Sequence, residues 1–341
     1  MGSTMKRDIN HQLLILKLQN KITGYFKSAW LASIITYYTP LMAIGLWLQI
    51  KYNYPIFSEG VIVALLWLAI CPALIQKAIL IIYDFFEDHK DIFINHEQWS
   101  RLKNQELQRF QSSRYLLFGV PWAISLAFVI WYSLFIHAPL PVQLWSLIVF
   151  FMMFVMSAIG FQGIYVIITI IGNICKSELV FRPFHPDKFG GFSRFGSFAV
   201  KGTIFFSSGA LVFPLAFEVF RKLGGHEKLA AYLVVFLFSF FILVLILSFL
   251  LPIFQIKYRV DMEKEKIILE ARAKLDKMVD SYLDSSENEL NKPIKIATYY
   301  YLNYNKLLEI KDYPWDLKVL FEFAVSFIIP IGIALIQIYS K

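Results

Sequence analysis

Charged residues are scarce in this sequence, and long apolar runs take their place. Charged side chains make up 17% of the 341 residues and hydrophobic ones 57%, whereas about a quarter of the residues in ordinary globular domains are charged. Several apolar runs reach the length of about 20 residues that a helix needs to cross about 30 Å of hydrocarbon. The composition therefore excludes an ordinary soluble domain and predicts an all-α, polytopic membrane helix bundle.

Cysteine is nearly absent, and patterns that bind metals are missing. Cys71 and Cys175 are the only two cysteines and form no CxxC pair, so neither a disulfide nor a cysteine-ligated metal is expected. His89 and His96 share one helical face of the segment EDHKDIFINHEQ, but no HExxH or HxxxH pattern accompanies them. We predict no metal site and no cofactor.

Ionisable residues are missing from the centres of the apolar runs. Lys77, Lys201, Glu218 and Glu322 lie near the ends of these runs, where long side chains can reach the membrane surface. Charges buried at mid-membrane usually mark proton or ion paths. Their absence counts against a proton-coupled transporter built on a buried carboxylate, and it leaves open a path lined by hydroxyls, amides or carbonyls.

The apolar runs and the positive charges together predict the topology. Lysine and arginine in short loops stay on the cytoplasmic side of a membrane. With the N-terminus inside, the inner segments hold 26 of these residues and the outer segments five. This distribution predicts about seven transmembrane helices, a cytoplasmic N-terminus and a C-terminus on the opposite side, with spans at 28–50, 60–83, 115–136, 142–171, 198–220, 229–254 and 318–339.

The spans divide the chain into four regions. These are an N-terminal interfacial helix (1–27), a six-span membrane domain (28–255) with cytoplasmic loops at 84–114 and 173–197, a cytoplasmic helical hairpin (256–317), and the seventh span with a short outer tail (318–341). Ile268, Leu275 and Tyr282 recur at seven-residue spacing, and a break containing Ser, Asn and Pro follows them. This pattern predicts the two arms of the hairpin.

The net charge of +8 bears on the partners. A basic excess is expected of a membrane protein whose loops remain in the cytoplasm, so it does not indicate nucleic acid. We expect contacts with membrane lipids, including anionic headgroups at the cytoplasmic face. The long cytoplasmic segments also predict a homo-oligomer or a cytoplasmic protein partner.

The loop between the fourth and fifth spans, ELVFRPFHPDKFGGFSRFGSF, is the least ordinary stretch. Its prolines stop helix formation and its paired glycines permit positive φ angles. Such a loop can form a nest of backbone amides that holds a phosphate or carboxylate. The alternative is a rigid loop in which Asp187 caps the following helix while the basic residues meet lipid headgroups. The candidate ligand-binding residues are Arg182, His185, Asp187, Gly190, Gly191 and Arg194.

Polar residues within the spans are the other candidates. Small residues and hydroxyls mostly serve helix packing, but proline and glycine also mark places where a helix opens toward a cavity. Gln162, Ser207 and Ser208 are our candidates for lining such a cavity or pore. The fourth span, 142–171, reaches about 45 Å as a helix, so it must tilt, kink at Gly160 or Gly163, or emerge into the cytoplasm.

Three functional hypotheses follow. The first is a channel or transporter-like protein regulated through its cytoplasmic loops and hairpin. The second is a membrane-anchored signalling or scaffold protein that binds a cytoplasmic partner. The third is an enzyme acting on lipid headgroups, with His185 and Asp187 as acid and base or as metal ligands; the sequence offers it no further support, and a protein that is not an enzyme is favoured.

Overall fold

The computed structural model describes residues 28–88, 93–111, 114–182, 187–209 and 227–283, together with a few single residues outside these ranges. Helices dominate these residues, which contain no strand beyond one isolated bridge between Phe93 and Leu179. The helices in chain order are α3 (Ala29–Ser33), the π-helix η1 (Ile34–Tyr38), α4 (Thr39–Tyr52), α5 (Glu59–Asp88), α6 (His96–Gln111), α7 (Arg114–Phe135), α8 (Leu140–Lys176), α9 (Ser193–Ser207) and α11 (Glu227–Leu283). The protein is all-helical, as predicted.

Among the described residues, four helical segments are long and apolar enough to cross a membrane. They are Ala29–Tyr52, Glu59–Asp88, Leu140–Lys176 and Phe238–Lys274, and Gly119–Phe135 is a shorter apolar helix. The fold is therefore that of a helical membrane protein.

The four long segments coincide with the first, second, fourth and sixth predicted spans, and α7 covers most of the third. The fifth predicted span begins within α9. The rest of the fifth span and nearly all of the seventh lie outside the described residues, as does the returning arm of the predicted hairpin. The seven-span count and the hairpin remain predictions. The sixth span does run on without a break into the charged segment that follows it, because both belong to α11.

The first span contains a wide turn for a local reason. Ser28 caps its start, where the hydroxyl accepts a hydrogen bond from the Leu31 amide at 3.4 Å. Pro40 lacks the amide of a regular helix, and its ring would clash with the preceding turn. The π-helical turn Ile34–Tyr38 directly precedes this proline. The chain remains helical through Pro40, and α4 ends at Tyr52. The residue that follows, Asn53, has a φ of 49° in the left-handed region.

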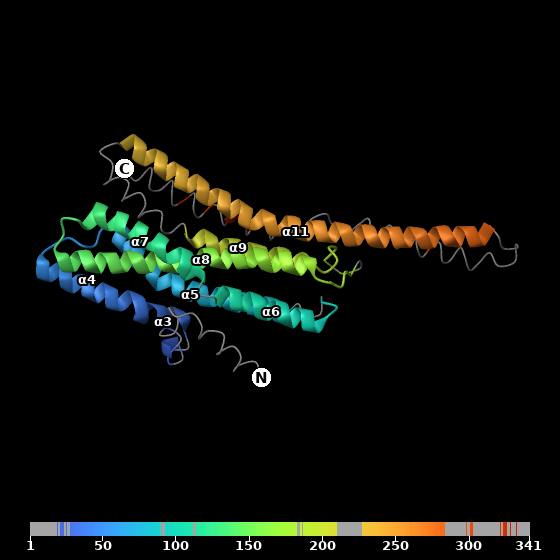
Figure 1. Ribbon diagram of the computed structural model, residues 1–341, viewed down its shortest axis with the longest axis horizontal. Helices are drawn as coiled ribbons and strands as arrows, with labels where there is room; N and C mark the ends of the chain where they lie inside the picture. The colour runs from blue at the N-terminus through green and yellow to red at the C-terminus, as the bar shows by residue number, and fades with distance from the viewer. Residues whose placement is uncertain are drawn as a thin grey trace.

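Helix α8 is the centre of the bundle. It contacts α4, α5, α6, α7, α9 and α11, which Figure 1 shows arranged around and along it. Indole groups tie its N-terminal half to the first two spans: Trp145 donates to the Leu41 carbonyl at 3.0 Å, and Trp67 donates to the Ser157 hydroxyl at 3.0 Å. These bonds satisfy the polar atoms of aromatic side chains within an apolar environment.

The length of α8 determines where α6 lies. Its 37 residues span roughly 55 Å, against about 30 Å of hydrocarbon. The helix is continuous through Gly160 and Gly163, so neither glycine interrupts it. Helix α6 packs beside its final turns (Figure 1), where the Gln162 amide donates to the carbonyls of Arg109 and Phe110 at 2.6 and 3.2 Å. We call this end of the bundle, with α6 and the 177–192 loop, the α6 end.

Two charged side chains on α6 are buried against its neighbours. Glu106 is fully buried on the α8 side, where Oε1 accepts from Arg109 at 2.7 Å and from Asn173 at 2.8 Å. Lys103 is 5% exposed on the α5 side, where it pairs with Glu87 and lies over the Tyr83 ring at 4.2 Å. Buried charges must be paired to be tolerated. Glu106 pairs with Arg109 within α6 and attaches it to α8 through Asn173, whereas Lys103 attaches α6 to α5 through Glu87.

The Glu87–Lys103 pair makes an asymmetric prediction. The side chain of Lys103 is 7% exposed and that of Glu87 is 38% exposed. Glu87→Ala leaves a buried ammonium without its carboxylate and should cost about 3 kcal/mol. Lys103→Met leaves a carboxylate that reaches water and should cost about 1 kcal/mol or less. Thermal unfolding of the detergent-solubilised protein, followed by tryptophan fluorescence, measures both; equal losses, or a larger loss for Lys103→Met, would contradict the assignment.

Candidate functional site

The 177–192 loop is held in place by aromatic packing. Phe189, Phe192 and Phe195 are each at most 1% exposed, and the Phe195 ring lies 5.5 Å from that of Phe85 on α5. The Phe181 ring covers Gly190, where an added Cβ would lie 2.1 Å from a ring carbon. Glycine is therefore required at 190 by the close contact as well as by its φ of 68°.

Asp187 occupies the nest of amides that this loop forms. Its Oδ1 accepts from the amides of Phe189 at 2.9 Å and Gly191 at 3.1 Å, and its Oδ2 accepts from Ser193, the first residue of α9, at 3.2 Å. His185 Nδ1 lies 2.9 Å from the same Oδ1. The carboxylate thus caps the start of α9 and takes the position that the sequence suggested for a phosphate or carboxylate ligand.

The other residues predicted at this site lie around the Asp187 cap. Gly191 has a φ of 93°, and the Arg182 amide donates to the Gly190 carbonyl at 3.1 Å. The side chains of Arg182 and Arg194 are exposed. Ligand binding by this group stays a prediction, as does contact of these residues with anionic headgroups.

Asp187 predicts a pH dependence of stability. Burial by itself would raise the pKa of Asp187, but hydrogen bonds from three backbone amides and from His185 hold that pKa below its ordinary value. Because the folded pKa is lowered, the stabilisation is present above the ordinary aspartate pKa of about 4 and is lost as the pH falls through the lower folded value. Asp187→Asn should cost about 1–3 kcal/mol near pH 7, and the difference from wild type should shrink toward pH 3.

Thermal unfolding midpoints between pH 3 and pH 8 test this prediction. Asp261→Asn is a suitable control, since Asp261 is 48% exposed at its side chain and lies 3.9 Å from Lys257. Parallel pH profiles for wild type and Asp187→Asn would show that the carboxylate does not carry this stabilisation.

The mid-span candidates make hydrogen bonds to the chain itself. The Gln162 amide caps the end of α6 as described, the Ser207 hydroxyl donates to the Ile204 carbonyl at 2.7 Å, and the Ser208 hydroxyl donates to the Phe205 carbonyl at 2.6 Å. Ser208 alone of these three lines the cavity described next. A pore lined by Gln162 and Ser207 stays a prediction.

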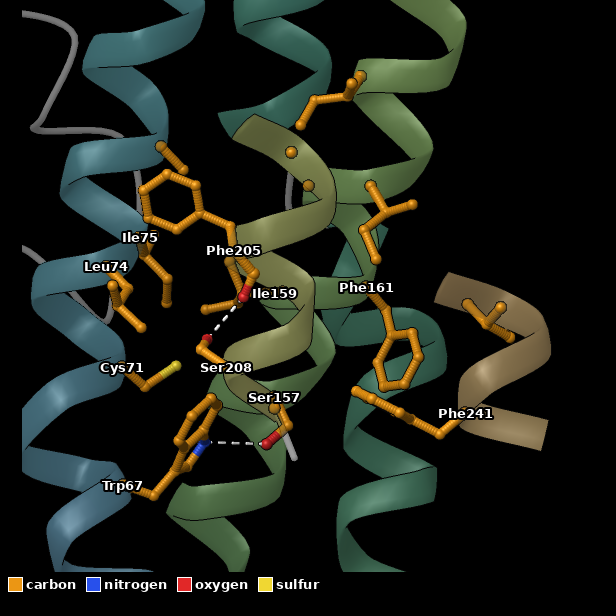
Figure 2. A pocket seen from close by; sticks show the side chains of 18 of the residues that line it. Trp67, Cys71, Leu74, Ile75, Ser157, Ile159, Phe161, Phe205, Ser208 and Phe241 are labelled. Atoms are coloured by element: carbon orange, nitrogen blue, oxygen red, sulfur yellow. Dashed lines mark hydrogen bonds between the residues drawn. The ribbon is translucent and has the colours of Figure 1, made fainter. Parts of the chain in front are cut away.

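A cavity of about 450 Å³ lies among α5, α7, α8, α9 and α11, a volume typical of small-molecule sites. Figure 2 shows Trp67, Cys71 and Ile75 facing it from one side and Phe161 and Phe241 from the other. Along α5 its lining extends from Trp67 to Ile82, which is roughly 22 Å of helix. The cavity therefore extends along more than half the thickness of the hydrocarbon layer, which is about 30 Å.

The hydroxyl and thiol groups in the lining are already hydrogen-bonded. The Ser157 hydroxyl accepts from Trp67 and donates to the Met153 carbonyl at 2.9 Å (Figure 2). The Cys71 thiol lies 3.7 Å from the Met156 carbonyl oxygen, and Ser208 is bonded to its own helix. A polar solute entering this cavity would lose hydration and gain few partners in return, whereas an apolar chain would lose little.

The cavity has an exposed aromatic side. Trp122, Phe161, Phe236 and Phe240 line it and are 57%, 49%, 65% and 52% exposed. Gly160 also lines it, and a Cβ added there would meet nothing within 4 Å. The sequence indicates Gly160 as a possible kink of the fourth span, and it gives no sign of the open space beside this residue.

The fold and the cavity define a class of protein, a helical membrane protein with an apolar cavity between its helices. No protein-family model, curated protein or solved structure matches the chain.

Proposed function

We propose that the protein is a transporter-like membrane protein that takes an apolar chain, such as a lipid acyl chain, from the bilayer into the cavity between α5, α8 and α9. The observation that supports it most directly is the chemistry of the lining. Its wall is aliphatic and aromatic, and its hydroxyl and thiol groups are bonded within the protein. Such a wall favours an alkyl chain over an ion or a sugar.

The exposed aromatic side gives this chain a route. Trp122, Phe161 and Phe240 lie at the open side of the cavity. Phe161 and Phe240 belong to helices with the length and composition of membrane spans, and Trp122 belongs to the shorter apolar helix Gly119–Phe135. A chain in the surrounding lipid can therefore enter laterally without crossing a polar surface. The positive charge of the predicted cytoplasmic loops favours an anionic headgroup on the same molecule.

Ion conduction has weaker support. A conduction path replaces the hydration shell of an ion with protein carbonyls, hydroxyls or charges. Gln162 and Ser207 direct their donors to backbone carbonyls of the chain itself. The lining of the cavity offers an ion no comparable set of groups among the described residues.

Filling the cavity tests the proposal. Gly160→Leu places a side chain into open space and should raise helix stability by up to about 1 kcal/mol, so the fold should be retained. The probe is phosphatidylcholine with a diazirine at the end of one acyl chain, incorporated into liposomes with the purified protein. We expect adducts at residues 71–75, where Cys71 and Ile75 are only 3% and 5% exposed, and a several-fold decrease in Gly160→Leu.

Ser125→Leu is the matched control, because it adds a leucine at an exposed position of α7 outside the cavity. Adducts at the exposed Trp122 report ordinary lipid contact and serve to normalise the signal. Labelling of Trp122 without labelling at 71–75, or equal labelling in wild type and Gly160→Leu, would refute the proposal. Ion flux above that of empty liposomes, lowered by Gln162→Leu, would favour a channel instead.

A further inference from the structure

Two lysines stand in helices that border the cavity. Lys77 is the only basic residue of α5, and Lys201 lies in the second half of α9, where the fifth predicted span begins. Both residues are exposed, and neither side chain forms an ion pair with another described residue. A basic residue within a membrane-spanning helix is costly and is commonly functional, so the position of these two lysines calls for a partner.

Helical register places both lysines beside the wall of the cavity. Lys77 follows the lining residue Leu74 by three positions and precedes the lining residue Ile81 by four. Lys201 precedes the lining residue Phe205 by four positions. Residues at these spacings are neighbours on one side of a helix. The cavity-lining faces of α5 and α9 therefore each adjoin a lysine.

Helices α5 and α9 run in opposite directions along the cavity. In Figure 2, α5 passes from Ile75 to Trp67 in the same direction as α9 passes from Phe205 to Ser208. Helix α6 is attached at the end of α5 through Glu87. The α6 end is therefore reached forward along α5 and backward along α9.

The two lysines lie on the α6 side of the cavity at similar levels. The rings of Phe85 and Phe198 stack at 4.0 Å and give a common reference for the two helices. From this contact Lys77 lies eight residues, or roughly 12 Å, along α5, and Lys201 lies three residues, or roughly 5 Å, along α9 in the same direction. Each ammonium group stands on a flexible four-carbon stem, so both can turn toward one anion.

We propose that Lys77 and Lys201 bind the anionic headgroup of the lipid whose acyl chain enters the cavity. This inference rests on the proposed function, and it specifies the substrate as a lipid with a phosphate or carboxylate that carries net negative charge. The wall of the cavity holds the chain through apolar contact alone. The lysines add the charge that distinguishes an anionic lipid from a zwitterionic one.

The length of the cavity agrees with this placement of the headgroup. Trp67 lies ten residues before Lys77, which is roughly 15 Å of helix. Half of the hydrocarbon layer, the thickness that one leaflet gives to an acyl chain, is also about 15 Å. The reverse orientation has no charge to support it, because α5 has no basic residue before Lys77 and α8 has none before Lys176. The chain end therefore points toward Trp67.

Neighbouring charges leave this role to the two lysines. Arg109 is next to the lining residue Phe110, but it pairs with the buried Glu106 at 2.7 Å. The nearest acidic residue to Lys77 along α5 is Asp84, seven residues further on, or roughly 10 Å along the helix. An anion at the level of the lysines thus meets two positive charges.

Photolabelling with two lipid probes tests the proposal. The probes are phosphatidylglycerol, which is anionic, and phosphatidylcholine, each with a diazirine at the end of one acyl chain, in liposomes with the full-length protein. Adducts at 71–75, normalised to those at Trp122, should be several-fold more abundant with phosphatidylglycerol. Lys77→Gln combined with Lys201→Gln should remove this preference and leave labelling by phosphatidylcholine unchanged. The two corresponding Arg substitutions should retain it. Because the label is on the chain, a soluble anion gives no signal.

Lys257→Gln combined with Lys266→Gln is the matched control, since it removes two basic residues of α11 that do not line the cavity, and the preference should persist. Equal normalised labelling by the two probes, a preference that survives without Lys77 and Lys201, or one that is lost in the α11 control would overturn this proposal and leave the acyl-chain site standing. Absence of adducts at 71–75 with both probes would instead refute the proposed function, and this inference with it.

Discussion

The rest of the structure depends on the excess length of α8. Its 37 residues extend well beyond the hydrocarbon layer, and the part beyond needs partners that a membrane does not supply. Helix α6 is one of them, attached through the buried Glu106 to Asn173 and through Lys103 to Glu87. The 177–192 loop is the other, because its Phe192 packs on Phe195 of α9, and Phe195 in turn lies against Phe85 of α5. One long helix thus organises both the membrane bundle and its extension.

Several polar side chains of this bundle make hydrogen bonds within the protein, and the wall of the cavity is left largely apolar. Trp67 is paired with Ser157, Gln162 with the end of α6, and Asp187 with the start of α9. What faces the open space is aliphatic and aromatic. The proposal of an acyl-chain site therefore rests on the same physical rule as the stability of the fold, namely that buried polar groups are paired.

Much of the fold could be predicted from the sequence. Runs of twenty or more apolar residues predicted the four long apolar helical segments that are found among the described residues. The alternative reading of the HPDKFGG stretch, with Asp187 as a helix cap, also agrees with the observed hydrogen bonds. These features are local, because helix length and capping depend on residues close together in the chain.

Other features depend on which helices meet. Lys103 and Glu106 belong to the predicted cytoplasmic loop 84–114, yet both are buried, because α6 packs between α5 and α8. The amide of Gln162, a candidate for lining a pore, donates to a carbonyl at the end of the neighbouring α6, a contact that the sequence does not indicate. The space beside Gly160 exists only because α5, α7, α8 and α11 diverge around it. The sequence by itself determined the membrane class and the long helices, since hydrophobicity and helix length are properties of single segments. The cavity and the contacts of Lys103 with Glu87 and of Glu106 with Asn173 were decided by tertiary structure, because each joins different helices.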